Sequence, residues 1–380
     1  MSAIFRLFFY KSNANSLGVL QSTTQLQLGA FRFHSFTVSY LKNSCGLSLE
    51  TAKSLSKKIQ FETPEKPDTV LKLLKDQGFN DAHISKIVRS RPELLSYNAQ
   101  KTVLPKFEFF HSMGVSSADI VAMFYGNPYL FCKSLERNII PCYQYLKSLL
   151  IVDKKVVQTF KFSRRSIFDP RMNLAPNLAL LKEFGVPQSS ISLMVPNYPD
   201  VAWLKPSRFT EIVKEVKQMG FDPSKSVFVK AIAVLACTTK STLESRFEVY
   251  GEWGWSRDES LSAFKKVPHC MNTSNEKITR VMNFFVNKMG WPSQILARHP
   301  IVISLSFEKR IFPRCNVAQV LLLKGLIQRD YSICTLLIPA EKTFLKNYVT
   351  KYQESVPQLL DLYKGKVNLH DLGVNTIGNI

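Results

Sequence analysis

The 380-residue sequence predicts an all-α solenoid of about seven helical repeats, each 32–36 residues long, closed by a C-terminal helical cap. Two observations lead to this fold class. A proline-led segment recurs along the chain, and a glycine with a bulky apolar neighbour lies upstream of each copy. A unit of this length cannot bury its own apolar face, so neighbouring units must stack on one another.

The recurring segment combines a proline, an apolar run and the start of a helix. Its clearest copies are RPELLSYNAQKTVLP (91–105), NPYLFCKSLERNIIP (127–141) and HPIVISLSFEKRIFP (299–313), with weaker copies at 198–212 and 267–281. The repeat prolines are Pro92, Pro128, Pro199, Pro268 and Pro300. The two long gaps between them predict degenerate copies within 141–176 and 217–247.

Each unit is expected to run helix, glycine turn, helix, short proline-led element. The sixth residue after the repeat proline is a good helix N-cap in four of the five copies: Asn98, Ser134, Ser274 and Ser306, with Lys205 in the fifth. Three copies carry a proline at the thirteenth residue, Pro105, Pro141 and Pro313, which should bend the helix. The upstream glycines should end the preceding helices in left-handed caps: Gly78, Gly114, Gly185, Gly254 and Gly290.

The charge of the chain indicates a polyanionic partner. Lys and Arg total 50 against 29 acidic residues, giving a net charge of +21, which favours nucleic acid or an anionic membrane surface. The ninth residue after the repeat proline is basic in all five copies: Lys101, Arg137, Arg208, Lys277 and Lys309. We call these the ninth-position cations.

A cation in the first turn of a helix opposes the helix dipole, so its recurrence suggests a use outside the fold. Stacked units would align such residues along one face, where they could follow a line of phosphates. The alternative is that these are ordinary solvated surface positions.

The first 49 residues contain no Asp or Glu and hold only four of the 50 basic residues. An acid-free, basic and hydroxyl-rich leader is typical of an organelle transit peptide. We expect a transit peptide at 1–35, a flexible linker at 36–65, the repeat domain at 66–365 and a C-terminal tail at 366–380. The expected destination is the mitochondrion, with the chloroplast as the alternative.

The sequence shows no pattern for catalysis. Phosphate-binding glycine loops, zinc-protease motifs and nucleophile elbows are missing, and the six histidines and seven cysteines have no metal-ligand spacing. We therefore expect no enzyme activity, cofactor, metal or small-molecule substrate. No apolar run reaches the ~18 residues of a membrane span, so no membrane insertion is expected. The phenylalanines fall at helical spacing and are expected in the core.

The unit LKDQGFNDAHISKIVRSRP (74–92) and the ending LARHPIVISLSFEKRIFPRCNVAQVLLLKGLI (296–327) resemble the mitochondrial transcription termination factor (mTERF) family, and CTLLIPAEKTFLKNYVTKY (334–352) is similar to its plant branch. The resemblance spans about 70–365. It implies a right-curved, half-doughnut solenoid with a basic concave face, acting on organellar nucleic acid. It also places Lys309, Arg310 and Arg314 where the family is basic.

These observations favour a monomer that binds double-stranded organellar DNA in transcription termination or regulation. Structured RNA is the alternative polymer, in group II intron splicing or ribosome biogenesis, because phosphate contacts carry no base information. A protein-binding scaffold is the alternative of another class, since solenoids also bind peptides. A peripheral membrane protein would need an exposed amphipathic helix.

Overall fold

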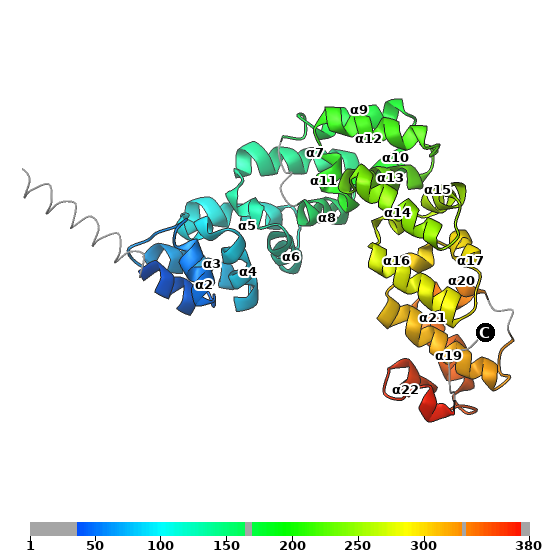
Figure 1. Cartoon of the computed structure of the whole chain (residues 1–380). Coiled ribbons are helices and arrows are strands. Elements are labelled where there is room, and N and C mark those ends of the chain that lie inside the picture. Colours follow the sequence, from blue (N-terminus) through cyan, green and yellow to red (C-terminus); the bar gives the residue numbers. More distant parts are fainter. Residues whose placement is uncertain (1–35, 164–168, 329–331, 374–380) are drawn as a thin grey trace, which may run out of the picture. The chain divides into compact units, whose positions relative to one another are not determined.

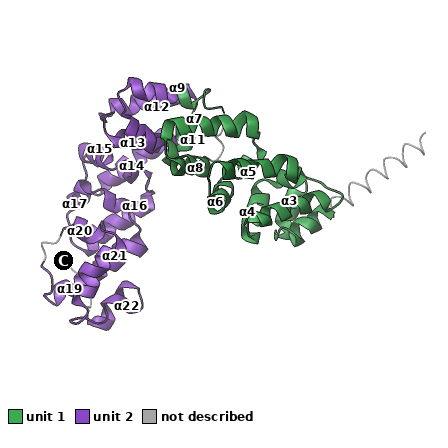
Figure 2. Ribbon diagram, turned by 180° about the vertical axis from the view of Figure 1, so that it is seen from behind, with its two compact units in different colours: residues 1–176, 195–204 green, residues 177–194, 205–380 purple. Residues whose placement is uncertain are grey.

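The computed structural model describes residues 36–163, 169–328 and 332–373, and throughout these ranges the regular elements are helices, as predicted (Figure 1). The expected transit peptide at 1–35 lies outside them. The chain forms two compact units: residues 1–176 with 195–204 are unit 1, and residues 177–194 with 205–380 are unit 2 (Figure 2).

Unit 1 contains a helix at 36–43, α2 (Leu49–Leu55), α3 (Glu65–Asp76), α4 (Asp81–Ser90), η1 (Pro92–Ser96), η2 (Ala99–Val103), α5 (Leu104–Ser112), α6 (Ser117–Gly126), η3 (Pro128–Cys132), η4 (Leu135–Ile139), α7 (Ile140–Leu150), α8 (Asp153–Phe162) and α11 (Pro199–Ala202). Two helices belong partly to each unit: α9 (Leu174–Glu183) and α10 (Gln188–Asn197).

Unit 2 contains α12 (Pro206–Gln218), α13 (Ser226–Cys237), α14 (Lys240–Glu252), α15 (Arg257–Lys266), η5 (Pro268–Asn272), α16 (Asn275–Met282), η6 (Asn283–Lys288), α17 (Ser293–Arg298), α18 (Ile301–Ser304), η7 (Phe307–Ile311) and α19 (Phe312–Leu323). Its C-terminal part contains α20 (Ile333–Leu337), α21 (Glu341–Phe344), η8 (Leu345–Val349), η9 (Thr350–Tyr352), α22 (Leu359–Tyr363) and η10 (His370–Leu372).

The repeat prediction is confirmed along the described residues. Seven helix–turn–helix units start at α3, η2, η4, α9, α12, α14 and α16, and the C-terminal cap starts at η7. Second helices of consecutive repeats pack on each other, α4 on α6 and α6 on α8 in unit 1, and α13 on α15 and α15 on α17 in unit 2. The five predicted turn glycines all have positive φ, between 68° and 90°. Stacking therefore buries the apolar faces that single repeats leave open.

The core of unit 1 is rich in aromatic rings. Phe107, Phe110, Phe124 and Phe131 are fully buried, and neighbouring rings meet edge-on or tilted, with Phe107 and Phe124 centroids 5.0 Å apart. Such pairs add to the free energy gained from burying the rings. The expectation that the phenylalanines form core therefore holds for this cluster.

Residues 36–65 differ from the expected flexible linker, because they fold against the first repeat. Leu41, Leu47 and Ala52 are buried. The Thr37 hydroxyl donates to the carbonyl of Phe61 and accepts from its N–H, at 3.3 and 3.2 Å. The apolar residues of this segment cover the end of the solenoid, as a terminal repeat requires.

The third repeat has an unusual turn where the other units use glycine. Ile151 has φ 64° and ψ −45°, and the N–H of Val152 donates to the carbonyl of Leu150 at 2.6 Å. A turn closed by a hydrogen bond between the first and third residues, with a positive φ at the second, is a strained γ-turn. A β-branched residue is poorly suited to that second position. The predicted degenerate copy within 141–176 is therefore present as α7 and α8, although Arg164, its expected counterpart of the repeat proline, lies outside the described residues.

Among the described helices, none is long and apolar enough by itself to cross a membrane. The helices α13 and α14 meet the length and composition criteria only as a pair, with a bend of 111° between them.

Candidate nucleic-acid interface

The ninth-position cations share a local scaffold in four of the five copies. The cap side chain accepts a hydrogen bond from the backbone N–H of the cation three residues later. The N···O distances are 2.8 Å for Asn98–Lys101, 3.2 Å for Ser134–Arg137, 3.3 Å for Ser274–Lys277 and 3.2 Å for Ser306–Lys309. Each of these cations is therefore fixed in the first turn of its helix, as the N-cap prediction requires. In the fifth copy, Lys205 makes no such bond and Pro206 starts α12.

A widened helical turn holds three of these positions. In each copy whose thirteenth residue after the repeat proline is itself a proline, the seventh to eleventh residues after the repeat proline form a π-helical turn. These turns are Ala99–Val103, Leu135–Ile139 and Phe307–Ile311. In the copies without that proline, α12 and α16 are regular helices at the same place. Proline lacks an N–H and clashes with the carbonyl four residues earlier, which is the carbonyl of the ninth residue. The π-turn removes this conflict by admitting one extra residue into the turn.

The side chains of the ninth-position cations differ in their surroundings. Lys101, Arg137 and Lys309 are exposed, and no ion pair to them is seen among the described residues. Arg208 is exposed but pairs with Glu211 at 3.1 Å. Three of the five cations are thus free to meet a polyanion directly.

Lys277 is half-buried, and its Nζ donates to the carbonyl of Ser304 at 3.0 Å. Partial desolvation lowers the pKa of this lysine. Arg310 lies next to Lys309 in the same π-turn and is also half-buried.

The prediction that Arg314 belongs to the nucleic-acid-binding residues is wrong. Arg314 is 1 % exposed, and its Nη1 donates to the carbonyls of Leu336, Leu337 and Pro339 at 3.1, 3.2 and 2.8 Å. A guanidinium that serves three backbone carbonyls inside the core cannot reach a phosphate. We therefore remove Arg314 from the candidate interface.

The remaining cations lie in both units. Unit 1 holds Lys101 and Arg137, at equivalent places in consecutive repeats, and unit 2 holds Arg208, Lys277, Lys309 and Arg310. In unit 1 the two consecutive repeats therefore present cations in the same register. In unit 2 the repeat that starts at α14 separates Arg208 from Lys277, and it has Thr242 at the equivalent place, where the N–H of Thr242 donates to the Thr239 side chain.

A pocket of about 520 Å³ lies between two of these helix starts in unit 2. Its lining includes Glu276, Lys277 and Arg280 of α16, Ser304 of α18, and Phe307 and Glu308 of η7. Arg280 pairs with Glu308, and its Cζ lies 4.2 Å from the centroid of the Phe307 ring. The repeat pattern does not single out Arg280, because the twelfth residue after the repeat proline shows no recurring charge in the other copies, where it is Leu104, Ile140, Glu211 and Phe312.

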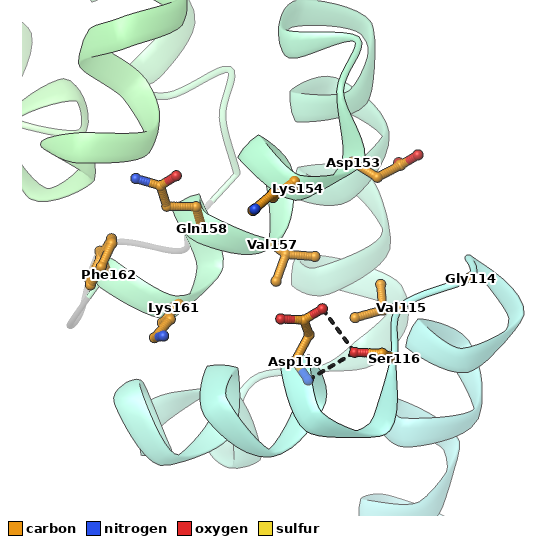
Figure 3. A pocket seen from close by; sticks show the side chains of 10 residues that line it. All are labelled: Gly114, Val115, Ser116, Asp119, Asp153, Lys154, Val157, Gln158, Lys161 and Phe162. Carbon is orange, nitrogen blue, oxygen red and sulfur yellow. Dashed lines mark hydrogen bonds between the residues drawn. The ribbon is translucent and has the colours of Figure 1, made fainter. Parts of the chain in front are cut away.

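A second pocket, of about 550 Å³, lies in unit 1 between α6 and α8 (Figure 3). Lys154, Gln158 and Lys161 line it from α8, and Asp119 lies opposite, accepting a hydrogen bond from the Ser116 hydroxyl at 2.8 Å. Asp153 also lines it, but its carboxylate pairs with Lys147 and points away from Lys154 and Lys161 (Figure 3). None of the ninth-position cations lines this pocket, and we leave it out of the candidate interface.

Comparison with known proteins gives the following matches. A family model described as mTERF matches residues 71–283 and 225–345. The chain is similar to "Transcription termination factor MTERF15, mitochondrial" of Arabidopsis thaliana, 23 % identical over 294 residues, which cover 77 % of this chain and 57 % of the relative. It is also similar to "Transcription termination factor MTEF18, mitochondrial" of the same organism, 18 % identical over 268 residues, which cover 70 % of this chain and 45 % of the relative. The chain thus spans about half the length of the curated relatives it matches.

Proposed function

Because the chain belongs to the mTERF family, we propose that it is an organellar nucleic-acid-binding protein that regulates mitochondrial gene expression. In this proposal it binds double-stranded DNA through the ninth-position cations and Arg310, acts in transcription termination or regulation, and performs no chemistry itself. The names of the two Arabidopsis thaliana relatives, both mitochondrial transcription termination factors, support this choice.

One observation carries the proposal. Basic side chains recur at a fixed place in the repeat, and in four of five copies the same N-cap bond holds that place. Lys101, Arg137 and Lys309 are exposed there, although a cation near a helix N-terminus opposes the helix dipole. Contact with phosphates offsets this local cost, because each neutralised phosphate releases condensed counterions.

The experiment that tests the proposal is a fluorescence anisotropy titration of the full chain. Labelled duplex DNA, duplex RNA and single-stranded RNA of one sequence are compared at several salt concentrations. We expect duplex DNA to bind most tightly, with log K falling against log salt by about 0.9 for each phosphate contacted. Tighter binding to RNA than to DNA would contradict the transcription role and favour a role in RNA processing. No binding to any of these polymers would favour the protein-binding scaffold.

The proposed location is the mitochondrion. The acid-free leader and the names of both relatives support it. Fusion of residues 1–50 to a fluorescent protein should direct the fusion to mitochondria, whereas changing Arg6, Lys11, Arg32 and Lys42 to Gln should abolish import. Delivery of the unchanged fusion to chloroplasts would contradict the proposed location.

A further inference from the structure

The pocket between α16 and η7 is lined by two cations and two carboxylates. The Glu276 carboxylate is held by Ser274 and by its own backbone N–H, and the two cations keep hydrogen-bond donors that no acceptor among the described residues uses. Lys277 has three ammonium N–H groups, of which the carbonyl of Ser304 accepts one. Arg280 has five N–H groups and is paired with Glu308. The hydroxyl oxygen of Ser304 is buried and has no hydrogen-bond partner among the described residues. The unused donors therefore suit an anion with several oxygens.

The guanidinium of Arg280 is held in position by an aromatic ring. Its Cζ lies 4.2 Å from the centroid of the Phe307 ring, close enough for a cation–π contact. Phe307 is itself fixed by Phe284 and Phe312, with ring centroids 5.3 and 6.0 Å away. The guanidinium is therefore already placed beside the pocket before any ligand arrives.

A phosphate could replace Glu308 as the partner of Arg280. The two side chains are 54 % and 62 % exposed, and exposed pairs of this kind contribute little to stability because water screens them. A phosphate that binds Arg280 in two places would be a stronger acceptor than this carboxylate. Glu308 would then be displaced toward solvent.

We propose that this pocket binds one backbone phosphate of the nucleic acid, held by Lys277 and Arg280, and that Glu308 limits its occupancy by competing for Arg280. The inference rests on the proposed function and deepens it. It adds Arg280 as a binding residue and Glu308 as a built-in competitor. Both a polymer backbone and free inorganic phosphate could supply this phosphate group. The polymer is favoured because Lys277, which lines the pocket, is one of the ninth-position cations proposed to bind nucleic acid.

The chain offers a closely matched control for the test. Arg257 pairs with Glu244 at 2.8 and 2.9 Å, and its Cζ lies 4.6 Å from the centroid of the Phe247 ring. This pair is likewise exposed, at 65 % and 51 %. It lies in the same unit but outside the pocket. Equal charge changes at the two places therefore separate a local site from the effect of net charge.

The test compares Arg280→Gln with Arg257→Gln, and Glu308→Gln with Glu244→Gln, by anisotropy with duplex DNA in the full chain. At 0.1 M salt we expect Arg280→Gln to weaken binding by roughly eightfold and to reduce the salt slope by about 0.9, the share of one phosphate. Glu308→Gln should tighten binding severalfold more than Glu244→Gln.

If each variant matches its control while wild type binds DNA with a steep salt dependence, this inference is overturned and the proposed function stands. If wild type binds no nucleic acid, both are overturned. Thermal unfolding with sodium phosphate against chloride at equal ionic strength tests the free anion. Stabilisation that is lost in Arg280→Gln, without an effect of that variant on DNA binding, would assign the pocket to free phosphate instead of the polymer.

Discussion

The guanidinium of Arg314 lies over the ring of Phe344, with Cζ 4.5 Å from the ring centroid, deep in the C-terminal part of unit 2. The same group donates to three backbone carbonyls. A cation in this setting joins α19 to the end of α20 and to α21. Its role is structural, although its sequence context is the most basic of the chain's repeat motifs.

Replacement of Arg314 by Gln should therefore destabilise the protein without a specific effect on DNA binding. Hydrogen bonds from charged donors contribute about 1.5–3 kcal/mol each, and buried carbonyls left without donors add a desolvation cost. We expect a loss of about 3 kcal/mol in the free energy of unfolding, measured by urea denaturation. Arg310→Gln is the control, with little effect on stability. A reduced salt slope for DNA in a fully stable Arg314→Gln protein would contradict this role.

Lys106 should make the stability of unit 1 depend on pH. It is 3 % exposed, its ammonium donates to the carbonyl of Phe131, and burial lowers its pKa to about 8. An unfolded chain keeps this proton up to about pH 10.4. Between these values the unfolded state binds more protons than the folded state, so stability rises with pH.

We expect wild type to gain about 2 kcal/mol relative to Lys106→Met between pH 8 and pH 10. Urea unfolding of both proteins across this range measures the difference, and the other titrating groups cancel because both proteins share them. Parallel pH profiles for the two proteins would show that Lys106 keeps an ordinary pKa.

Replacement of Ile151 by glycine should stabilise the turn between α7 and α8. The Ile151 side chain is 77 % exposed, so it contributes little packing, while its positive φ is unfavourable for a residue with a branched Cβ. Ile151→Gly should raise the free energy of unfolding by about 1 kcal/mol relative to Ile151→Ala, which keeps the strain and removes the rest of the side chain. Equal stability of the Gly and Ala variants would mean that the turn is not strained.

The repeat pattern predicted the backbone structure of the candidate interface well, because this structure depends on local interactions. N-cap side chains, turn glycines and repeat prolines act within a few residues of themselves. The four cap bonds and five left-handed glycines therefore follow from the sequence. The thirteenth-position prolines predicted a disturbed helix but not its form, which the structure gives as a π-turn.

The repeat alignment itself shows why the assignment of Arg314 to the nucleic-acid interface was wrong. Arg314 is the fourteenth residue after the repeat proline, and its counterparts are Lys106, Cys142, Val213 and Met282, all buried. Three apolar residues in five copies mark this place as core, so a cation there must find partners inside the protein. The partners themselves lie more than twenty residues away in the chain, and no local pattern predicts them. The same holds for the pairing of Arg280 with Glu308 across two repeats.

The most direct test of the proposed interface changes all five ninth-position cations to Gln and measures the salt dependence of DNA binding. The control changes five exposed lysines at other repeat positions, and therefore alters the net charge equally: Lys72, Lys182, Lys214, Lys240 and Lys324. We predict that the slope of log K against log salt becomes shallower by about 4.5 in the first variant, at about 0.9 for each of five phosphate contacts, and that this variant loses most of its affinity. The control variant should keep nearly the slope of wild type. Equal losses in the two variants would contradict a phosphate-binding register and leave only a general effect of positive charge.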